Sequence, residues 1–185
     1  MGETGAERSA DATPGGGAAP AGAVAIGLAA PSDAEAISAL CAACWWDTYR
    51  ALVADESIEQ AIAEYYHPAR IREEIGRGSW LVAADRGALV GAARGHMVED
   101  DAGEVFDLYI APERQRRGVG TRLLRALTER QLAQGATEQW TSVLKANRKG
   151  MTFFDVRGFV TWDQRSTRRM NRDERSPYQR LWRYV

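Results

Sequence analysis

The stretch Gln115–Thr121 carries two glycines two residues apart, directly after two arginines. An apolar run with β-branched and aromatic residues precedes it at 105–110, and leucines and alanines at helical spacing follow it at 122–127. A glycine-rich turn between a strand and a helix can point several backbone N–H groups into one concavity, where the helix dipole favours an anion. The chemistry predicted for this turn is therefore the binding of a phosphate-bearing cofactor.

Two other phosphate-binding loops fit the stretch poorly. A Walker A loop needs a glycine followed by lysine and then serine or threonine, and Gly118–Thr121 has no lysine. A dinucleotide-binding loop needs a third glycine where Leu123 stands and, after a further strand, an acidic residue about 20 positions on. Nucleotide-binding domains also begin with the strand–loop–helix unit, whereas here an antiparallel meander is predicted before it. Both nucleotide readings are therefore excluded.

Two carboxylates, Glu104 and Asp107, lie on the strand that leads into this loop. They are three positions apart, so in a regular strand they face opposite sides of the sheet, and only a β-bulge would bring them to one side. On a helix predicted further upstream, Trp46 and Tyr49 are also three apart and share a face. These two aromatic residues are candidates for lining a substrate pocket, with plain packing as the alternative.

The elements that must position these residues alternate between helical and extended patterns. The apolar spacing predicts two helical regions before a meander of strands, the second broken near His67-Pro68 because the residue before proline resists the α region. The expected ranges are 24–28 (strand), 37–52 and 58–75 (helices), 80–84 and 88–97 (hairpin), 104–110 (strand), 118–134 (helix), 139–144 (strand), 148–156 (helix), and 159–163 and 178–184 (strands).

Length and composition describe one ordinary globular domain. The chain has 185 residues, 45% of them hydrophobic, and a formal net charge of −1, which does not indicate a nucleic-acid binder or a membrane-surface protein. Residues 1–22 are rich in small and polar residues and are predicted to be disordered, and residues 23–185 are predicted to form the domain. No signal peptide and no membrane span is predicted. We therefore expect a cytoplasmic protein.

Cys41 and Cys44 form a C-x-x-C pattern. A metal site would need a second pair of ligands, but the chain has no other cysteine, and its two histidines are isolated in the sequence. A thioredoxin-like site would open a helix after a strand, whereas this pattern lies in the middle of a predicted helix. Core packing is the favoured interpretation, redox or metal chemistry is the alternative, and no metal site is predicted.

Two motifs around the loop resemble those of a known superfamily. Residues 108–120 are similar to an L-Y-V-x-P strand end followed by Q/R-x-x-G-x-G/A, and residues 147–159 are similar to N-x-x-A-x-x-F-Y-x-x-x-G-F. Both resemble signatures of the GNAT superfamily of acyl-CoA-dependent N-acyltransferases, and the resemblance extends over residues 24–185. It implies an α/β (α+β) fold, with a mixed, mostly antiparallel sheet of about six or seven strands that is flanked by helices and splayed at the coenzyme site.

The resemblance also implies how acetyl-CoA would be held as cosubstrate. Main-chain groups of Leu108 and Ile110 would bond the pantetheine amides, and Asn147 would contact the coenzyme beyond the next strand. Backbone N–H groups of the loop would hold the pyrophosphate, with two arginine side chains adding charge. The loop residues are Gln115, Arg116, Arg117, Gly118, Val119, Gly120 and Thr121.

The implied activity is transfer of an acetyl group to a primary amine, of a small molecule or a peptide, by direct attack on the thioester. The site must take a proton from an ammonium group. Glu104 resembles the acidic residue that many members carry on this strand and is the first candidate for general base; Asp107 is the second and His96 a distant third. Phe154 departs from the pattern, because it stands where the family has a tyrosine as general acid. Tyr109, water or another hydroxyl would have to replace that tyrosine, or the thiolate would leave unprotonated.

The Phe154 departure keeps a second function open, a non-catalytic acyl-CoA-binding or regulatory domain. The arginine-rich stretch 165–176 is read as a solvated loop, with contact to an acidic substrate or a CoA phosphate as the alternative. Nucleic-acid binding by these arginines is disfavoured, because the net charge is near zero and no recognition motif is present. The identity of the amine and the oligomeric state, a homodimer included, stay open.

Overall fold

The computed structural model describes residues 24–162 and 177–185. The predicted disordered segment 1–22 and the arginine-rich stretch 165–176 lie outside the described residues. The elements follow the predicted order, with ends that differ from the predicted ones by a few residues. They are β1 (Ala25–Leu28), α1 (Ala34–Tyr49), α2 (Asp55–Tyr65), α3 (Pro68–Gly76), β2 (Trp80–Asp85), β3 (Ala88–Met97), β4 (Ala102–Ile110), α4 (Val119–Leu132), β5 (Glu138–Leu144), α5 (Arg148–Asp155), β6 (Val160–Thr161) and β7 (Tyr178–Tyr184).

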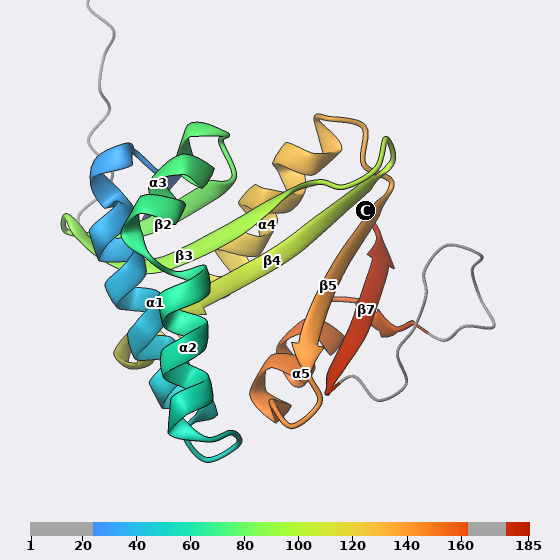
Figure 1. The fold of residues 1–185 in the computed structure, drawn as a ribbon. Helices are drawn as coiled ribbons and strands as arrows, with labels where there is room; N and C mark the ends of the chain where they lie inside the picture. Colours follow the sequence, from blue (N-terminus) through green and yellow to red (C-terminus); the bar gives the residue numbers. More distant parts are fainter. Residues whose placement is uncertain (1–23, 163–176) are drawn as a thin grey trace, which may run out of the picture.

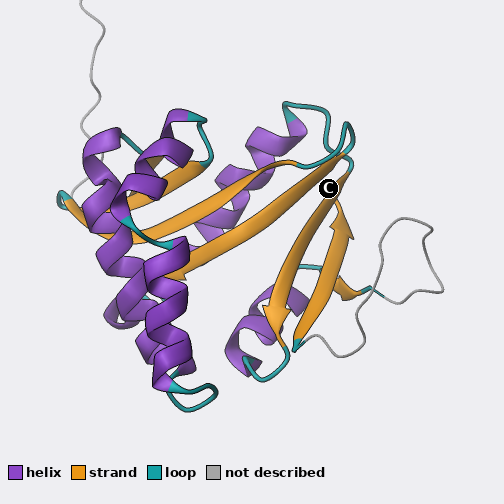
Figure 2. Ribbon diagram, viewed as in Figure 1, coloured by secondary structure: helices purple, strands orange, loops and turns teal. Residues whose placement is uncertain are grey.

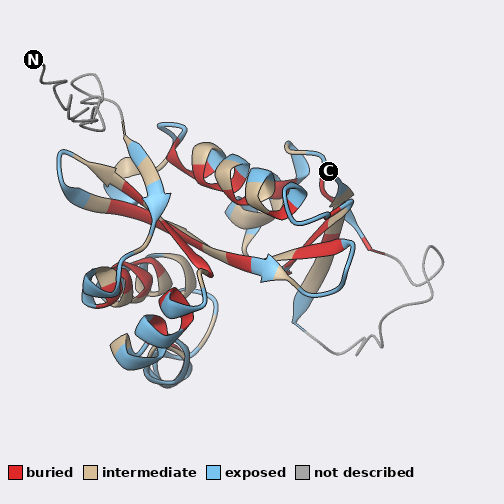
Figure 3. Cartoon of the chain, turned by 90° about the horizontal axis from the view of Figure 1, so that it is seen from above, coloured by how far each residue is buried: buried red, intermediate tan, exposed pale blue. Residues whose placement is uncertain are grey.

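The strands form one seven-stranded sheet in the order β1-β2-β3-β4-β5-β7-β6. All neighbours are antiparallel except β4 and β5, which run parallel. Helix α4 covers one face of the sheet, and α1 and α3 pack on the other (Figure 3). The predicted α/β (α+β) class, with a mixed and mostly antiparallel sheet flanked by helices, is confirmed.

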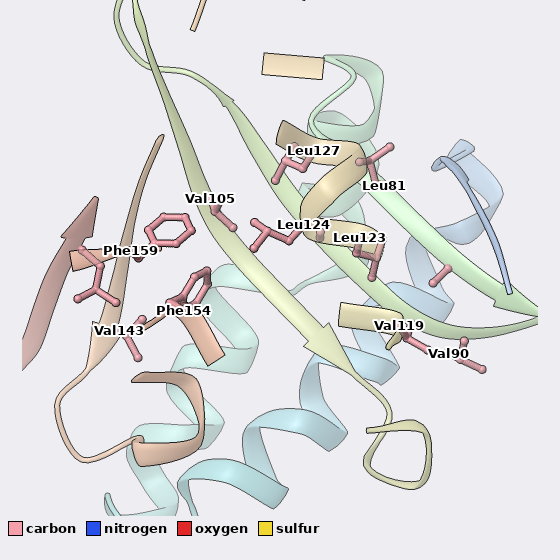
Figure 4. Close-up of a cluster of buried hydrophobic side chains, with 13 residues drawn as sticks. Leu81, Val90, Val105, Val119, Leu123, Leu124, Leu127, Val143, Phe154 and Phe159 are labelled. Atoms are coloured by element: carbon pink, nitrogen blue, oxygen red, sulfur yellow. The ribbon is translucent and has the colours of Figure 1, made fainter. Parts of the chain in front are cut away.

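The first hydrophobic core lies between the sheet and α4 and continues to α5. Leu123 and Leu127 of α4 belong to the same buried cluster as Val105 of β4, Phe154 of α5 and Phe159 (Figure 4). The cluster contains residues from β4 and from β5, such as Val105 and Val143. It therefore holds the two halves of the sheet together even where the two strands no longer pair.

The second core lies under α1 and α3 and contains Cys41 and Cys44 as free, buried thiols. Burial raises the pKa of both, that of Cys44 to about 12. Core packing, which the sequence favoured, is confirmed. In residues 24–162 and 177–185, no group of three or more His, Cys, Asp or Glu side chains could hold a metal ion, and no helix is long and apolar enough to cross a membrane.

Strands β4 and β5 separate along their length. Their pairing runs from Ala102 opposite Glu138 to Val105 opposite Thr141 and stops there. Beyond this point, among the strands that the structure describes, β4 pairs only with β3 and β5 only with β7. Figures 1 and 2 show the two strands meeting at one end of the sheet and diverging towards the ends where α2 and α5 lie. The sheet is therefore splayed, as predicted.

Candidate functional site

A cleft of about 1000 Å³ occupies the opening between β4 and β5. Its walls come from α1, β4, the loop before α4, β5 and α5. The volume lies at the upper end of the roughly 300–1,000 Å³ that is typical of small-molecule and cofactor sites. The cleft is thus large enough for an extended ligand.

The β4 wall offers main-chain groups that no strand uses. The amide of Ala111 donates to the carbonyl of Val90 on the β3 side at 3.0 Å. Bonded and non-bonded pairs alternate along an antiparallel ladder, so Leu108 and Ile110 direct their N–H and C=O groups away from β3. Strand β5 does not pair there, and both residues line the cleft. The two residues predicted to bond the pantetheine therefore face the opening.

The loop before α4 ends in a left-handed turn. Gly118 has a φ of +81° and Arg116 a φ of +61°; glycine adopts this region without strain, whereas arginine does so rarely. The backbone N–H groups of residues 118–121 have no acceptor within the helix, as at the start of any α-helix. No described side chain caps them either. The Gln115 amide donates to the Ile110 carbonyl at 3.3 Å and ties the loop to β4. An uncapped helix N-terminus of this kind suits a phosphate.

Two of the predicted loop positions serve packing. A Cβ at Gly120 would lie 3.1 Å from the Phe153 ring, so the glycine lets α5 approach the first turn of α4. The Val119 side chain is buried in the first core. Arg117 is exposed and lies outside the cleft wall. The predicted loop residues that line the cleft are Gln115, Arg116, Gly118, Gly120 and Thr121.

The cleft wall carries an excess of positive charge. Its only carboxylate among the described residues is Asp107, which is itself paired with Arg94 at 2.5 Å. A low-dielectric cleft lined by one sign of charge attracts ligands of the opposite sign. The cationic side chains of the wall are Arg114, Arg116, Arg148, Lys149 and Arg157.

A β-bulge brings the two predicted carboxylates to one face of β4. Arg94 of β3 pairs with Asp107, but the next residue, Gly95, pairs with Val105. Phe106 is therefore an extra residue in β4, and the alternation of side chains shifts by one position. Val105 points into the core under α4, so Glu104 and Asp107 both lie on the opposite face, which α1 and α3 cover.

Glu104 lies beside the cleft and not in its wall. Both carboxylate oxygens accept from the guanidinium of Arg180 on β7, with Nη2 to Oε2 at 3.3 Å. Arg180 also donates to the hydroxyl of Ser142 at 3.1 Å, and Ser142 does line the cleft. The ion pair therefore adjoins the cleft near the end where β4 and β5 still pair.

Asp107 lies in the cleft wall, but its oxygens are in use. The Tyr66 hydroxyl donates to Oδ1 at 2.7 Å and Arg94 Nε donates to Oδ2 at 2.5 Å. Since Tyr66 has only one proton, the Tyr109 hydroxyl must be the donor in the 2.8 Å contact between the two tyrosines. Trp45 Nε1 donates to the Tyr109 oxygen at 2.8 Å. Burial raises the pKa of Tyr66 and Tyr109, so this chain of hydrogen bonds stays intact at neutral pH.

The two aromatic candidates at the end of α1 have different surroundings. Tyr49 lines the cleft, and its ring centroid lies 4.6 Å from that of Trp45. Burial raises the pKa of Tyr49. Asn147, which directly precedes α5, lines the cleft as well. Trp46 lies outside the wall, with Arg50 over its ring at 5.6 Å.

Several residues of the site were not predicted from the sequence. Arg94 binds Asp107, Arg180 binds Glu104, and Arg157 enters the wall beside Thr121. Arg180 is 76 positions from Glu104, and Arg157 is 36 positions from Thr121. A local motif cannot report such pairs, because they depend on which strands and helix ends the fold brings together.

Comparisons with known proteins agree with this geometry. A model of the acetyltransferase (GNAT) family matches residues 43–159, well over half of the chain. A PaiA N-acetyltransferase from Thermoplasma acidophilum, solved with coenzyme A, has a TM-score of 0.79 at 22% identity over 88% of this chain and 99% of its own. A GCN5-related N-acetyltransferase from Rhodopseudomonas palustris has a TM-score of 0.70 at 21% identity over 91% of this chain and 100% of its own.

A third similar fold is the N-acetylglutamate synthase from Neisseria gonorrhoeae, solved with coenzyme A and N-acetyl-glutamate. Its TM-score is 0.63 at 22% identity, over 87% of this chain and 35% of the synthase chain. Among curated protein sequences, none matches. Because the family model covers more than half of the chain, the chain belongs to the GNAT acetyltransferase family. Membership confirms the predicted resemblance and supports acetyl-CoA as the cosubstrate.

Proposed function

We propose that this protein is an N-acetyltransferase that moves the acetyl group of acetyl-CoA to a primary amine by direct attack. The observation that carries the proposal is the opening of the sheet directly before the uncapped N-terminus of α4. Main-chain groups of β4 that are not paired with β5 and a phosphate cradle thereby share one cleft. The coenzyme A complexes of two proteins with a similar fold support the same ligand here.

The residues of the cleft fit the coenzyme part by part. Main-chain groups of Leu108 and Ile110 would hold the pantetheine amides, with a side-chain contact from Asn147. The N–H groups of residues 118–121, helped by Arg116, would hold the pyrophosphate. When bound, acetyl-CoA supplies an activated acetyl group as a thioester, which a neutral amine attacks to exchange a C–S bond for a C–N bond.

The acceptor must lose a proton before it can attack, and we assign the role of general base to Glu104, acting through a water molecule. The bulge at Phe106 places Glu104 on the same face of the sheet as Asp107. Asp107 is the weaker candidate, because its side chain is only 4% exposed, against 14% for Glu104. Two buried partners, Tyr66 and Arg94, hold the oxygens of Asp107, whereas Arg180 alone, among the described residues, bonds those of Glu104. Arg180 would orient the Glu104 carboxylate.

Phe154 leaves the family's acid position without a hydroxyl. Its ring is buried, with its centroid 5.0 Å from that of Phe159. Tyr109 does not replace the missing group, because its proton is donated to Tyr66. We therefore expect the leaving thiolate to take its proton from water. Phe154→Tyr should then raise kcat by several-fold and up to about tenfold, whereas Phe159→Tyr, in the same core, should not.

The first experiment measures the melting temperature with and without acetyl-CoA and then screens amines for release of the free thiol. A binding-induced rise followed by turnover of one amine class supports the proposal. A rise without turnover across primary amines of small molecules and peptides would instead support the non-catalytic binding domain, which the Phe154 departure favours. No rise at saturating coenzyme would refute both functions.

A second experiment tests Glu104 as the base. In the wild type we expect kcat/KM to increase with pH as a larger fraction of the amine is neutral. Glu104→Gln should lower and flatten this increase, whereas Glu99→Gln, an exposed position in the turn before β4, should leave it unchanged. An unaltered profile in Glu104→Gln would remove the residue from the mechanism.

A further inference from the structure

Arg157, just beyond the end of α5, reaches the first turn of α4. Its Nη2 donates to the hydroxyl of Thr121, the third residue of α4, and both residues line the cleft. Its guanidinium also lies over the Phe153 ring at 3.7 Å from the centroid, and a Cβ at Gly120 would lie 3.1 Å from the same ring. The cation is therefore fixed to the N-terminal turn of α4 and exposed to the cleft.

A structural role explains only part of this arrangement. Arg157 Nη1 donates to the Phe153 carbonyl at 2.6 Å, and a cation that binds carbonyls in the last turn of a helix stabilises that helix. The Nη2 contact is different, because the N-terminus of α4 carries partial positive charge. A guanidinium placed beside it is unfavourable unless an anion lies between the guanidinium and the helix N-terminus.

Arg157 also has no carboxylate partner in the part of the chain that the structure describes. Its Nε is buried and has no hydrogen-bond partner within residues 24–162 and 177–185. Arg183 adds a second cation nearby by donating to the Arg157 carbonyl at 2.8 Å. Burial lowers the pKa of the Arg157 guanidinium.

We propose that Arg157 is a phosphate-binding residue of the coenzyme site, which completes the cradle formed by the N–H groups of α4. The inference rests on the proposed function, since it assigns a new residue to the same ligand. A guanidinium presents a fork of N–H donors that matches phosphate oxygens. Because Phe153 and Thr121 already hold the side chain, little conformational entropy is lost when it binds.

The test compares coenzyme A with pantetheine, which has the same arm and no phosphate, by calorimetric dissociation constants. Arg157→Ala should raise the dissociation constant for coenzyme A by about tenfold. Arg157→Lys should raise it by less, because lysine keeps the positive charge but lacks the paired N–H donors of the guanidinium. The loss should shrink in high salt. Pantetheine should bind the wild type and both variants equally. Arg125→Ala, an exposed arginine of α4, is the matched control and should change neither ligand.

Two outcomes would overturn the assignment. If Arg157→Ala leaves the affinity for coenzyme A unchanged, the residue does not touch the phosphate. If the substitution weakens the binding of coenzyme A and of pantetheine by the same factor, the role of Arg157 is to hold α5 against α4. Arg157→Gln, which keeps the stem over Phe153, repeats the comparison if the alanine variant folds poorly. Failure of the wild type to bind coenzyme A would be a separate result, which refutes the proposed function itself.

Discussion

The two sides of the cleft differ in how their polar groups are satisfied. On the side of α4 and α5, the N–H groups of residues 118–121 lack acceptors in the helix, and Arg157 lacks a carboxylate among the described residues. On the side of α1, α3 and β3, Asp107 is bonded to Tyr66 and Arg94, and Arg94 continues to Glu74 at 2.6 Å.

This difference distinguishes residues that are available to bind a ligand from residues that stabilise the fold. Buried polar groups are nearly always hydrogen-bonded, so donors left open in a cleft point to a partner that is not part of the chain. A network whose members satisfy one another is rigid and has no capacity left for a substrate. We therefore expect substitutions on the first side to change affinity, and substitutions on the second side to change stability.

The largest effect should come from the network. Asp107→Ala removes a carboxylate that is 4% exposed, leaves Tyr66 without its acceptor and leaves Arg94 paired with Glu74 alone among the described residues. Breaking a buried ion pair from one side costs about 3–5 kcal/mol, so we expect the free energy of unfolding in urea to fall by that order. Asp107→Asn, which keeps the shape, should cost less. A fully stable alanine variant with reduced turnover would instead make Asp107 a catalytic group.

The next largest effect should come from the loop. Gly118→Glu forces a side chain into a left-handed turn and places a carboxylate in the anion cradle, so coenzyme affinity should fall by at least about a hundredfold. Gly87 is the matched control, because it has the same φ of +81° and equally open surroundings in the β2–β3 turn. If Gly87→Glu reduces affinity as strongly, the effect is one of folding and not of the cradle.

A smaller effect should distinguish the two aromatic residues of α1. Tyr49→Phe removes the hydroxyl of a residue that lines the cleft, so dissociation constants for the coenzyme, the amine or both should rise by about three- to tenfold. Trp46→Phe, outside the wall, should change neither. An effect at Trp46 and none at Tyr49 would show that the acceptor approaches from outside the cleft described here.

The smallest effect should appear in alkaline stability. Burial raises the pKa of Cys44 from 9.0 to about 12, so above pH 9 the unfolded chain loses a proton that the folded chain keeps. The contribution of Cys44 is therefore complete below pH 9 and is lost as pH rises towards 12. Urea unfolding between pH 8 and pH 10.5 should show this decline, and Cys44→Ala should reduce its slope. An identical slope in the variant would refute the assignment.

Much of the fold could be predicted because local chemistry determines it. Pro68 makes the residue before it extended, so α2 and α3 are separate helices, as expected. The glycine at 118 marks the start of α4 because only glycine adopts its backbone angle without strain. The residues that face the opening with main-chain groups, Leu108 and Ile110, were also predicted. Ligand binding by main-chain groups depends on where a residue lies along the strand, and a local sequence motif indicates that position.

The tertiary structure alone decided which side chains are free to act. Glu104 and Asp107 were placed on one strand by the sequence, but the bulge that turns them to the same face depends on how β3 pairs with β4. Their partners, Arg180 and Arg94, come from other strands. The sequence thus determined what the protein holds, because the loop residues adjoin along the chain. The availability of acids and bases depends on distant partners, and only the folded chain brings those into contact.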